Sequence, residues 1–383
     1  MSETIMIGCD LHDRSMLIRF AVGQGDPIQA VFSNDALGRE TLLTRIQAEA
    51  KKHGVVRIVL AYEASGQGYG FSDFLYDAGI ECHVLSPTHL PKTPKSAKQK
   101  TDAKDAQMLL EQLRGFVLAG NTLPAVWTPS QRLRDDRELV RARVDVSDDV
   151  TRIKLQILSQ LKRYGIPKPS WYSSWTKRFV GWLRDRAASL DQFVATVLSS
   201  LIDRYELFQQ EQLKLDKAVK TLSQTERYQA ACQDLRKLPG VGLLSAMTFL
   251  TEMGDLQRFN NRREVAAYLG LCPSSFESGE ANDRKGRITR QGPARVRKLL
   301  CQAAWSSINR CDEAKEAYHR IKGGKSNRTK KAVVAMMRRL AIVMWHRAVA
   351  CGTADELRGR GGPDKSRKRK QVVIETCQVM VVA

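Results

Sequence analysis

The chain has 383 residues, enough for two or three domains that each bury a hydrophobic core. Its composition, 43% hydrophobic and 27% charged, is that of a globular protein and argues against disorder or a fibre. Lys and Arg number 62 against 41 Asp and Glu, so the net charge of +21 favours a polyanionic partner, with nucleic acid ahead of anionic lipid. No apolar run approaches the length of about 18 residues that a membrane span needs, and the N-terminus lacks a secretion signal, so we expect a cytoplasmic protein.

The eight cysteines are scattered along the chain, and none forms a C-x-x-C pair. Disulfide frameworks and structural zinc sites both need clustered spacing, so the pattern predicts reduced thiols and no structural zinc.

Residues 1–125 are expected to form a mixed α/β domain. Helical spacing predicts two helices, at 35–52 and 71–78. Short apolar runs bounded by turn residues predict five strands, at 5–9, 16–22, 28–32, 57–61 and 81–85. Three meandering strands followed by helix, strand, helix and strand is the order of a ribonuclease-H-like sheet.

Residues 126–232 are expected to form a helical segment that mediates assembly. Apolar residues repeat at four-three spacing over 146–161 and again over 201–222, a pattern typical of a coiled coil or a long helical hairpin. Two helices within one bundle and helices from two copies are equally compatible with this spacing. Residues 233–352 are expected to form a mostly helical domain, and residues 353–383 a mobile basic tail.

Four carboxylates of the first domain are candidate metal ligands. Asp10 ends the first strand run and Glu63 follows the fourth, so neighbouring parallel strands would bring both to one edge of the sheet. Asp102 and Asp105 lie three residues apart on one face of a helix. Together they would suit two Mg²⁺ ions, which prefer oxygen ligands and support phosphodiester cleavage. Taken singly, Asp10 and Asp102 have ordinary explanations as turn or helix-start residues, whereas Glu63 at the end of an apolar strand is less easily explained in this way.

Several basic and glycine positions are candidate nucleic-acid contacts. Lys100 and Lys104 flank the acidic helix, where they would serve a phosphate-binding groove or simply face solvent. Gly240 and Gly242 precede an apolar helix at 243–253, either letting backbone N–H groups approach a phosphate or forming an ordinary turn. A Gly/Ser loop at 270–280 is followed by a basic loop that contains four further candidates, Arg284, Lys285, Arg287 and Arg290.

The sequence resembles the IS110 family of insertion-sequence transposases, now understood as bridge-RNA-guided recombinases. The resemblance covers nearly the whole chain except the basic tail, which is longer than the family pattern leads us to expect. It rests on an ordered set of motifs: Ile7–Asp10, Tyr62–Gly66, Lys100–Ala106, Leu238–Gly242, Ala267–Pro273, Phe276–Gly279 and Ala335–Ala341.

The resemblance implies a RuvC-like N-terminal domain in which Asp10, Glu63, Asp102 and Asp105 bind Mg²⁺. It further implies that Ser278, the serine before a glycine in the C-terminal domain, attacks a DNA phosphodiester to form a transient phosphoserine. Ser274 and Ser275 lie nearby, and from the residues alone no serine stands out. The implied partners are donor and target double-stranded DNA, a guide RNA that selects both by base pairing, and further copies of the chain in a dimer or tetramer, acting in a bacterial or archaeal cell at the nucleoid.

Two alternatives to this interpretation remain at the level of sequence. A RuvC-type nuclease or Holliday-junction resolvase would use the four carboxylates with water as the nucleophile and would not need Ser278. A non-catalytic nucleic-acid-binding scaffold would need only the positive charge, the heptads and the glycine turns.

Overall fold

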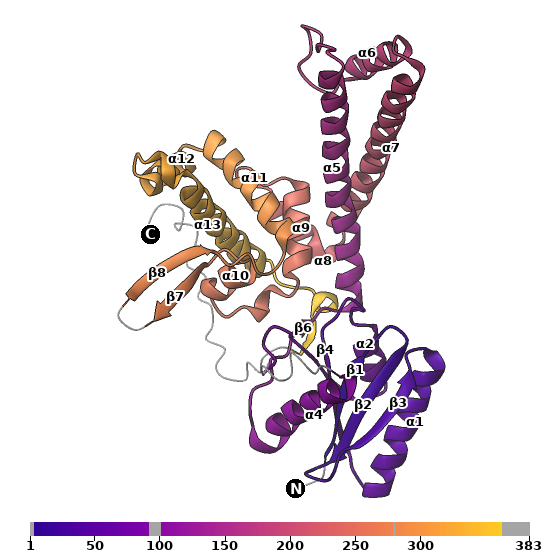
Figure 1. Ribbon diagram of the computed structural model, residues 1–383. Coiled ribbons are helices and arrows are strands. Elements are labelled where there is room, and N and C mark those ends of the chain that lie inside the picture. The colour runs from indigo at the N-terminus through magenta and orange to yellow at the C-terminus, as the bar shows by residue number, and fades with distance from the viewer. Residues whose placement is uncertain (1–3, 92–100, 279–280, 362–383) are drawn as a thin grey trace. The chain divides into compact units, whose positions relative to one another are not determined.

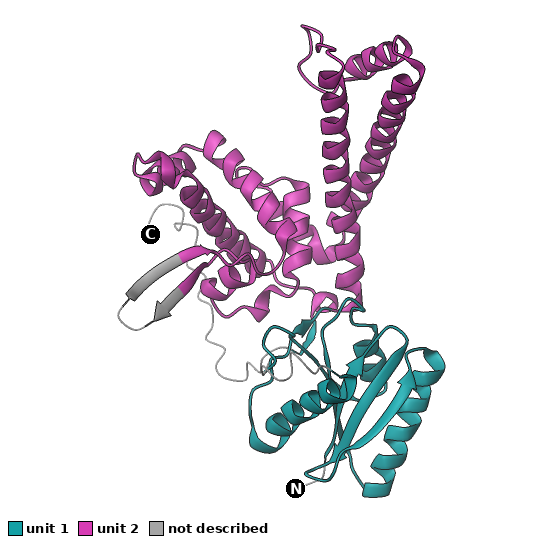
Figure 2. Cartoon of the chain, viewed as in Figure 1, with its two compact units in different colours: residues 1–129, 359–371 teal, residues 130–358, 372–383 magenta. Residues whose placement is uncertain are grey.

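The computed structural model describes residues 4–91, 101–278 and 281–361. These residues form two compact units (Figure 2). Within the described ranges, unit 1 contains the chain up to Pro129 together with residues 359–361, and unit 2 contains residues from Ser130 to Arg358. Among the described residues, none of the helices combines the length and apolarity needed to cross a membrane.

Unit 1 is built on a five-stranded sheet with the order β3-β2-β1-β4-β5. The first three strands form an antiparallel meander, and β4 and β5 continue the sheet in parallel with β1 (Figure 1). The strands are β1 (Thr4–Leu11), β2 (Ser15–Val22), β3 (Ile28–Ser33), β4 (Arg57–Glu63) and β5 (Glu81–Leu85), and the helices are α1 (Ala36–His53), α2 (Gly70–Asp77) and α4 (Asp102–Ala119). The predicted order of elements is confirmed, with ends that differ by no more than two residues.

The two faces of this sheet carry different helices because side chains alternate along each strand. Ile5 and Ile7 of β1 belong to a buried cluster with Leu42 of α1, and this cluster also includes residues of α2. Met6, on the opposite face, belongs to a second cluster with Leu109 of α4. The sheet is therefore covered by α1 and α2 on one face and by α4 on the other.

Unit 2 is helical apart from one strand pair. Its elements are α5 (Gln131–Arg163), α6 (Lys177–Ala188), α7 (Gln192–Ser223), α8 (Glu226–Leu235), α9 (Leu243–Met253), η1 (Leu256–Arg258), α10 (Arg262–Tyr268), β7 (Pro273–Ser278), β8 (Ala281–Ile288), α11 (Ala294–Arg310), α12 (Asp312–Lys322), η2 (Ser326–Arg328), α13 (Thr329–Ala350) and η3 (Asp355–Leu357). The predicted mixed α/β region followed by a helical region is confirmed.

The heptad-like repeats lie on α5 and α7, which pack against each other as a long helical hairpin (Figure 1). Ile153 and Ile157 of α5 share a buried cluster with Leu201 and Tyr205 of α7, and Phe179 of α6 joins the same cluster. The apolar seam is therefore satisfied within one chain. A coiled coil between copies stays a prediction.

The loops expected at 270–280 and 284–292 differ from the structure, in which β7 and β8 form an antiparallel pair. Their Gly and Ser content favours loops, but pairing between the two segments satisfies the backbone groups of both and outweighs that local preference.

The first residues of the segment expected to be a mobile tail are structured. Within residues 353–361 the chain forms η3 and then β9 (Arg360–Gly361), which pairs with β6 (Trp127–Thr128) in unit 1. The Arg360 guanidinium lies 3.5 Å from the centre of the Tyr76 ring and 3.5 Å from the Asp73 carboxylate, which holds this strand in place. Residues 362–383 lie outside the described residues.

Candidate active site

Strand alternation places two of the predicted carboxylates on the sheet face that α4 covers. On β1, Asp10 follows Met6 at an even spacing, and on β4, Glu63 follows the buried Val59 and Ala61 of the same cluster in the same way. The parallel register pairs Cys9 with Tyr62, so Asp10 and Glu63 are the next residues of adjacent strands. Both strands therefore carry a carboxylate at the same level of this face.

Gly8 lets helix α4 approach β1 unusually closely. A Cβ atom at this position would lie 2.1 Å from the Ala106 carbonyl oxygen and 2.5 Å from the Leu110 backbone nitrogen. No side chain fits at such distances, so only glycine allows this approach. Because Ala106 follows Asp105 in the first turns of α4, the close packing also fixes how near the acidic start of that helix comes to β1.

Helix α4 begins with two of the predicted carboxylates. Asp102 is its first residue and Asp105 lies in the same turn, where negative charge is favourable at the positive end of the helix dipole. The Thr101 carbonyl accepts hydrogen bonds from the backbone N–H groups of Lys104 and Asp105, at 2.9 and 3.1 Å.

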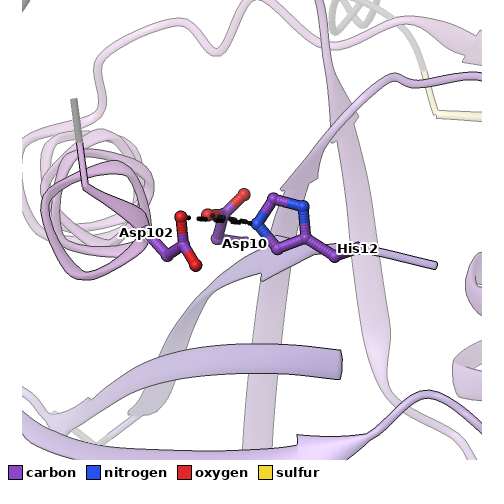
Figure 3. A group of neighbouring side chains, drawn as sticks. All are labelled: Asp10, His12 and Asp102. Atoms are coloured by element: carbon purple, nitrogen blue, oxygen red, sulfur yellow. Dashed lines mark hydrogen bonds and ion pairs between the residues drawn. The ribbon is translucent and has the colours of Figure 1, made fainter. Parts of the chain in front are cut away.

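His12 joins Asp10 and Asp102 in one cluster (Figure 3). Its Nε2 lies 3.1 Å from Asp10 Oδ2 and 3.5 Å from Asp102 Oδ1. One potential ligand atom from each of the three residues lies within 4.8 Å of the others. His12 is not among the site residues predicted from the sequence. The available signal was a histidine two positions beyond the first carboxylate, in the turn between β1 and β2.

Asp10 lies in an environment that disfavours its charge. Its side chain is only 17% exposed, and this burial raises the pKa of its carboxyl above the usual value. The nearby carboxylates of Asp102 and Asp105 raise the pKa further, whereas His12 opposes them through its charge and its hydrogen bond. A bound cation would relieve this crowding of negative charge.

The other two predicted ligands lie outside this three-residue cluster. Asp105 is half-buried and close enough for its charge to act on Asp10. Glu63 is half-buried at the end of β4. The donor set of carboxylate oxygens and an imidazole nitrogen suits a divalent cation, so the residues present fit a metal site. The four-carboxylate set stays a prediction.

An open, mostly polar hollow lies beside the cluster, lined by Leu11–Ser15 and Ser65–Gln67. Asn34 connects its two walls, because its Nδ2 donates to the His12 carbonyl at 2.7 Å and to Gln67 Oε1 at 3.0 Å. Arg39 in turn donates to Asn34 Oδ1 at 2.8 Å. The turn that carries His12 is thereby fixed, and the hollow beside it is open to solvent.

The nucleic-acid contacts predicted near α4 and α9 differ in how exposed or closely packed they are. Lys104 is exposed on α4, and Lys100 lies outside the described residues. Gly240 has φ +82°, and a Cβ there would lie 2.3 Å from the Ala303 carbonyl oxygen, so packing on α11 by itself requires this glycine. Gly242 caps the start of α9 with open space around it.

The serine and the basic residues of the C-terminal segment lie on the β7–β8 hairpin. Ser278 is the last residue of β7, and its backbone pairs with Ala281. The side chains of residues 276–285, including those of Ser278, Arg284 and Lys285, lie outside what the structure describes. Arg287 and Arg290 are exposed.

The base of this hairpin is tightly fixed. Arg297 Nη1 donates to the carbonyl oxygens of Leu269, Gln291 and Gly292, at 3.2, 2.8 and 3.0 Å. A Cβ on Gly292 would lie 1.9 Å from the Tyr268 carbonyl oxygen. The strand that carries Ser278 therefore extends from an anchored base.

Comparison with known proteins identifies the class. A protein-family model for transposases, named for the DEDD transposases of the IS110 type, matches residues 7–166, which include the whole acidic cluster. A second model, described as transposase of the IS116/IS110/IS902 family, matches residues 232–320, which include the hairpin.

Curated relatives agree with these matches. A putative transposase, y4qE, of Sinorhizobium fredii is 32% identical over 256 residues, 65% of this chain and 58% of the relative. The transposase for insertion sequence element IS1533 of Leptospira borgpetersenii is 23% identical over 80% of this chain and 86% of its own length. The transposase for element IS1111A of Coxiella burnetii is 24% identical over 65% of each.

An α/β domain with an acidic cluster, matched together with a second transposase domain, defines a transposase, an enzyme that cleaves DNA and transfers its strands. The chain belongs to the IS110 family of insertion-sequence transposases.

Proposed function

We propose that the chain is an RNA-guided DNA recombinase that cuts and rejoins donor and target double-stranded DNA, using Mg²⁺ in unit 1 and the Ser278 hydroxyl as the nucleophile. The observation that carries this proposal is the cluster of Asp10, His12 and Asp102 at the meeting point of β1 and α4. The sheet order β3-β2-β1-β4-β5, with β1, β4 and β5 parallel, supports a RuvC-like domain.

The reaction would be a transesterification. The Ser278 hydroxyl would lose its proton as its oxygen attacks the phosphorus of a DNA phosphodiester. The bond from phosphorus to the deoxyribose oxygen would break, and that oxygen would take up a proton and leave as a hydroxyl, so no net proton is gained or lost. The phosphoserine conserves the ester bond, so attack by a DNA hydroxyl rejoins the strand and restores the serine. Serine is a weak nucleophile by itself. The chemistry that bound Mg²⁺ supplies is activation of the attacking oxygen and stabilisation of the leaving one.

The chain's own residues would bind and orient the substrate. Asp10, Glu63, Asp102 and Asp105 would hold the metal, and the open hollow beside them would admit the DNA backbone. The excess of positive charge favours a guide RNA as well as DNA. The α5–α7 hairpin would join copies of the chain into a dimer or tetramer in the cytoplasm.

A RuvC-type nuclease or junction resolvase is the second candidate, because the acidic cluster is formed entirely by residues of unit 1 and includes no residue of the β7–β8 hairpin that carries Ser278. In that mechanism water would replace Ser278, and no covalent intermediate would form.

A gel assay separates the two candidates. The full chain, expressed with the non-coding RNA of its element, is mixed with end-labelled donor and target DNA and Mg²⁺, and the products are run on a denaturing SDS gel. We expect a slow, protease-sensitive DNA band that Ser278→Ala abolishes. The control is Ser274→Ala, a serine of the same strand whose hydroxyl donates to the Arg287 carbonyl at 3.1 Å. Equal free cleavage products from wild type and Ser278→Ala would exclude the serine mechanism and leave the nuclease.

A further inference from the structure

We propose that His12 is a nitrogen ligand of the divalent metal bound by Asp10 and Asp102, and that this nitrogen shifts the preference of the site from Mg²⁺ toward Mn²⁺. This inference rests on the metal site of the proposed function. It adds a ligand to that site and narrows the class of metal that the site takes.

The distances around His12 match those between ligands of one ion. Its Nε2 approaches Asp10 Oδ2 at 3.1 Å and Asp102 Oδ1 at 3.5 Å, so one nitrogen faces both carboxylates. Ligands at neighbouring corners of an octahedron lie about 3.0 Å apart when the metal–ligand distance is about 2.1 Å. One ligand atom from each residue lies within 4.8 Å of the other two, so adjustment of the side chains would let the three atoms share one cation.

The backbone of His12 is fixed by hydrogen bonds at both of its polar groups. The backbone N–H of His12 donates to the Ser15 carbonyl at 2.9 Å, and the His12 carbonyl accepts from Asn34 Nδ2 at 2.7 Å. The side chain is 49% exposed, so solvent can bond to Nδ1 while Nε2 faces the carboxylates. A water bound to Nδ1 would fix the ring orientation, as hydrogen-bond partners of the second ring nitrogen do in metal sites.

A nitrogen donor changes which cations the site favours. Mg²⁺ prefers oxygen ligands and gains little from an imidazole, whereas transition metals bind imidazole well. Removing His12 should therefore lower Mn²⁺ affinity by about tenfold or more, the scale on which changes around a metal ligand act, and change Mg²⁺ affinity much less.

Mn²⁺ is a suitable probe because its electron spin reports directly bound nitrogen. Pulsed EPR on the full chain loaded with Mn²⁺ should show nitrogen modulation from a coordinated imidazole. His12→Gln keeps a hydrogen-bond donor near the position of Nε2 but removes the imidazole, so the modulation should disappear. The matched control is His53→Gln, because His53 lies 3.6 Å from the carboxylate of Glu49 and is not part of the Asp10, His12 and Asp102 cluster.

Calorimetric titration with Mn²⁺ and Mg²⁺ completes the test, with Asp10→Asn as the variant that removes a carboxylate and thermal melting as the check on folding. Absence of nitrogen modulation in wild type, together with Mn²⁺ affinity that is unchanged in His12→Gln but lost in Asp10→Asn, would overturn the role of His12 and leave the metal site standing. Mn²⁺ and Mg²⁺ binding that Asp10→Asn does not alter would instead overturn the proposed metal site itself.

Discussion

Replacing Gly8 with alanine tests whether close packing of α4 on β1 builds the acidic cluster. The added Cβ would lie 2.1 Å from the Ala106 carbonyl oxygen, whereas a carbon–oxygen contact needs about 3.2 Å, so α4 must move by about 1 Å. Both contacting atoms belong to helix backbone and cannot rotate away, so the strain falls on the packing of the whole helix.

The expected cost of Gly8→Ala follows from overpacking a filled core, about 1 to 3 kcal/mol. For a domain of this size, about 4 °C of melting temperature corresponds to 1 kcal/mol, so Tm should fall by about 4 to 12 °C. A shift of about 1 Å at the start of α4 also moves Asp102 from Asp10 and should reduce strand cleavage by about a hundredfold.

The assay combines thermal melting of the full chain with a strand-cleavage measurement. The matched control is Gly70→Ala in the same unit, where a Cβ would meet nothing within 4 Å, so stability should hold or rise slightly. If Gly8→Ala melts like wild type, the helix has room that the structure does not show. If it melts lower yet cleaves at the wild-type rate, the close approach does not position the carboxylates.

Two further substitutions probe charge in each unit. The raised pKa of Asp10 means that its carboxylate destabilises the fold once the pH exceeds that pKa. Asp10→Asn should therefore raise the free energy of unfolding at pH 7 in EDTA, and this gain should vanish below about pH 4, where the unfolded carboxyl is also protonated. Lower stability of the variant at pH 7 would contradict this. Arg227→Met leaves the buried carboxylate of Asp136 without its paired guanidinium and should lower the free energy of unfolding in urea by about 3 kcal/mol. The control Arg152→Met, at an exposed ion pair, should lower it by no more than about 1 kcal/mol. Equal losses would refute the importance of burial.

The sheet of unit 1 could be predicted because its strands are short apolar runs separated by turn residues. The same logic placed Asp10 and Glu63 at the ends of adjacent strands, and the spacing of Asp102 and Asp105 placed both in the first turn of α4. These inferences needed only the period of each element and the direction of parallel strands.

Other features depend on contacts between distant segments. His12 joins the cluster because the turn after β1 brings it beside α4, which begins 90 residues later at Asp102. The β7–β8 pair forms although its composition favours loops, since pairing satisfies both backbones. Residues 360–361 pair with β6, and the Arg360 guanidinium stabilises this pairing by packing on the Tyr76 ring and forming an ion pair with Asp73. No local pattern reports such partners.

The most direct test of the central claim is strand cleavage by Asp102→Asn beside Glu111→Gln. Both changes turn a carboxylate of α4 into an amide, but Asp102 belongs to the acidic cluster, whereas Glu111 pairs with Arg114. With the element's RNA, labelled DNA and Mg²⁺, we expect Asp102→Asn to abolish cleavage with its melting curve intact and Glu111→Gln to cleave like wild type. Full cleavage by Asp102→Asn would contradict the account.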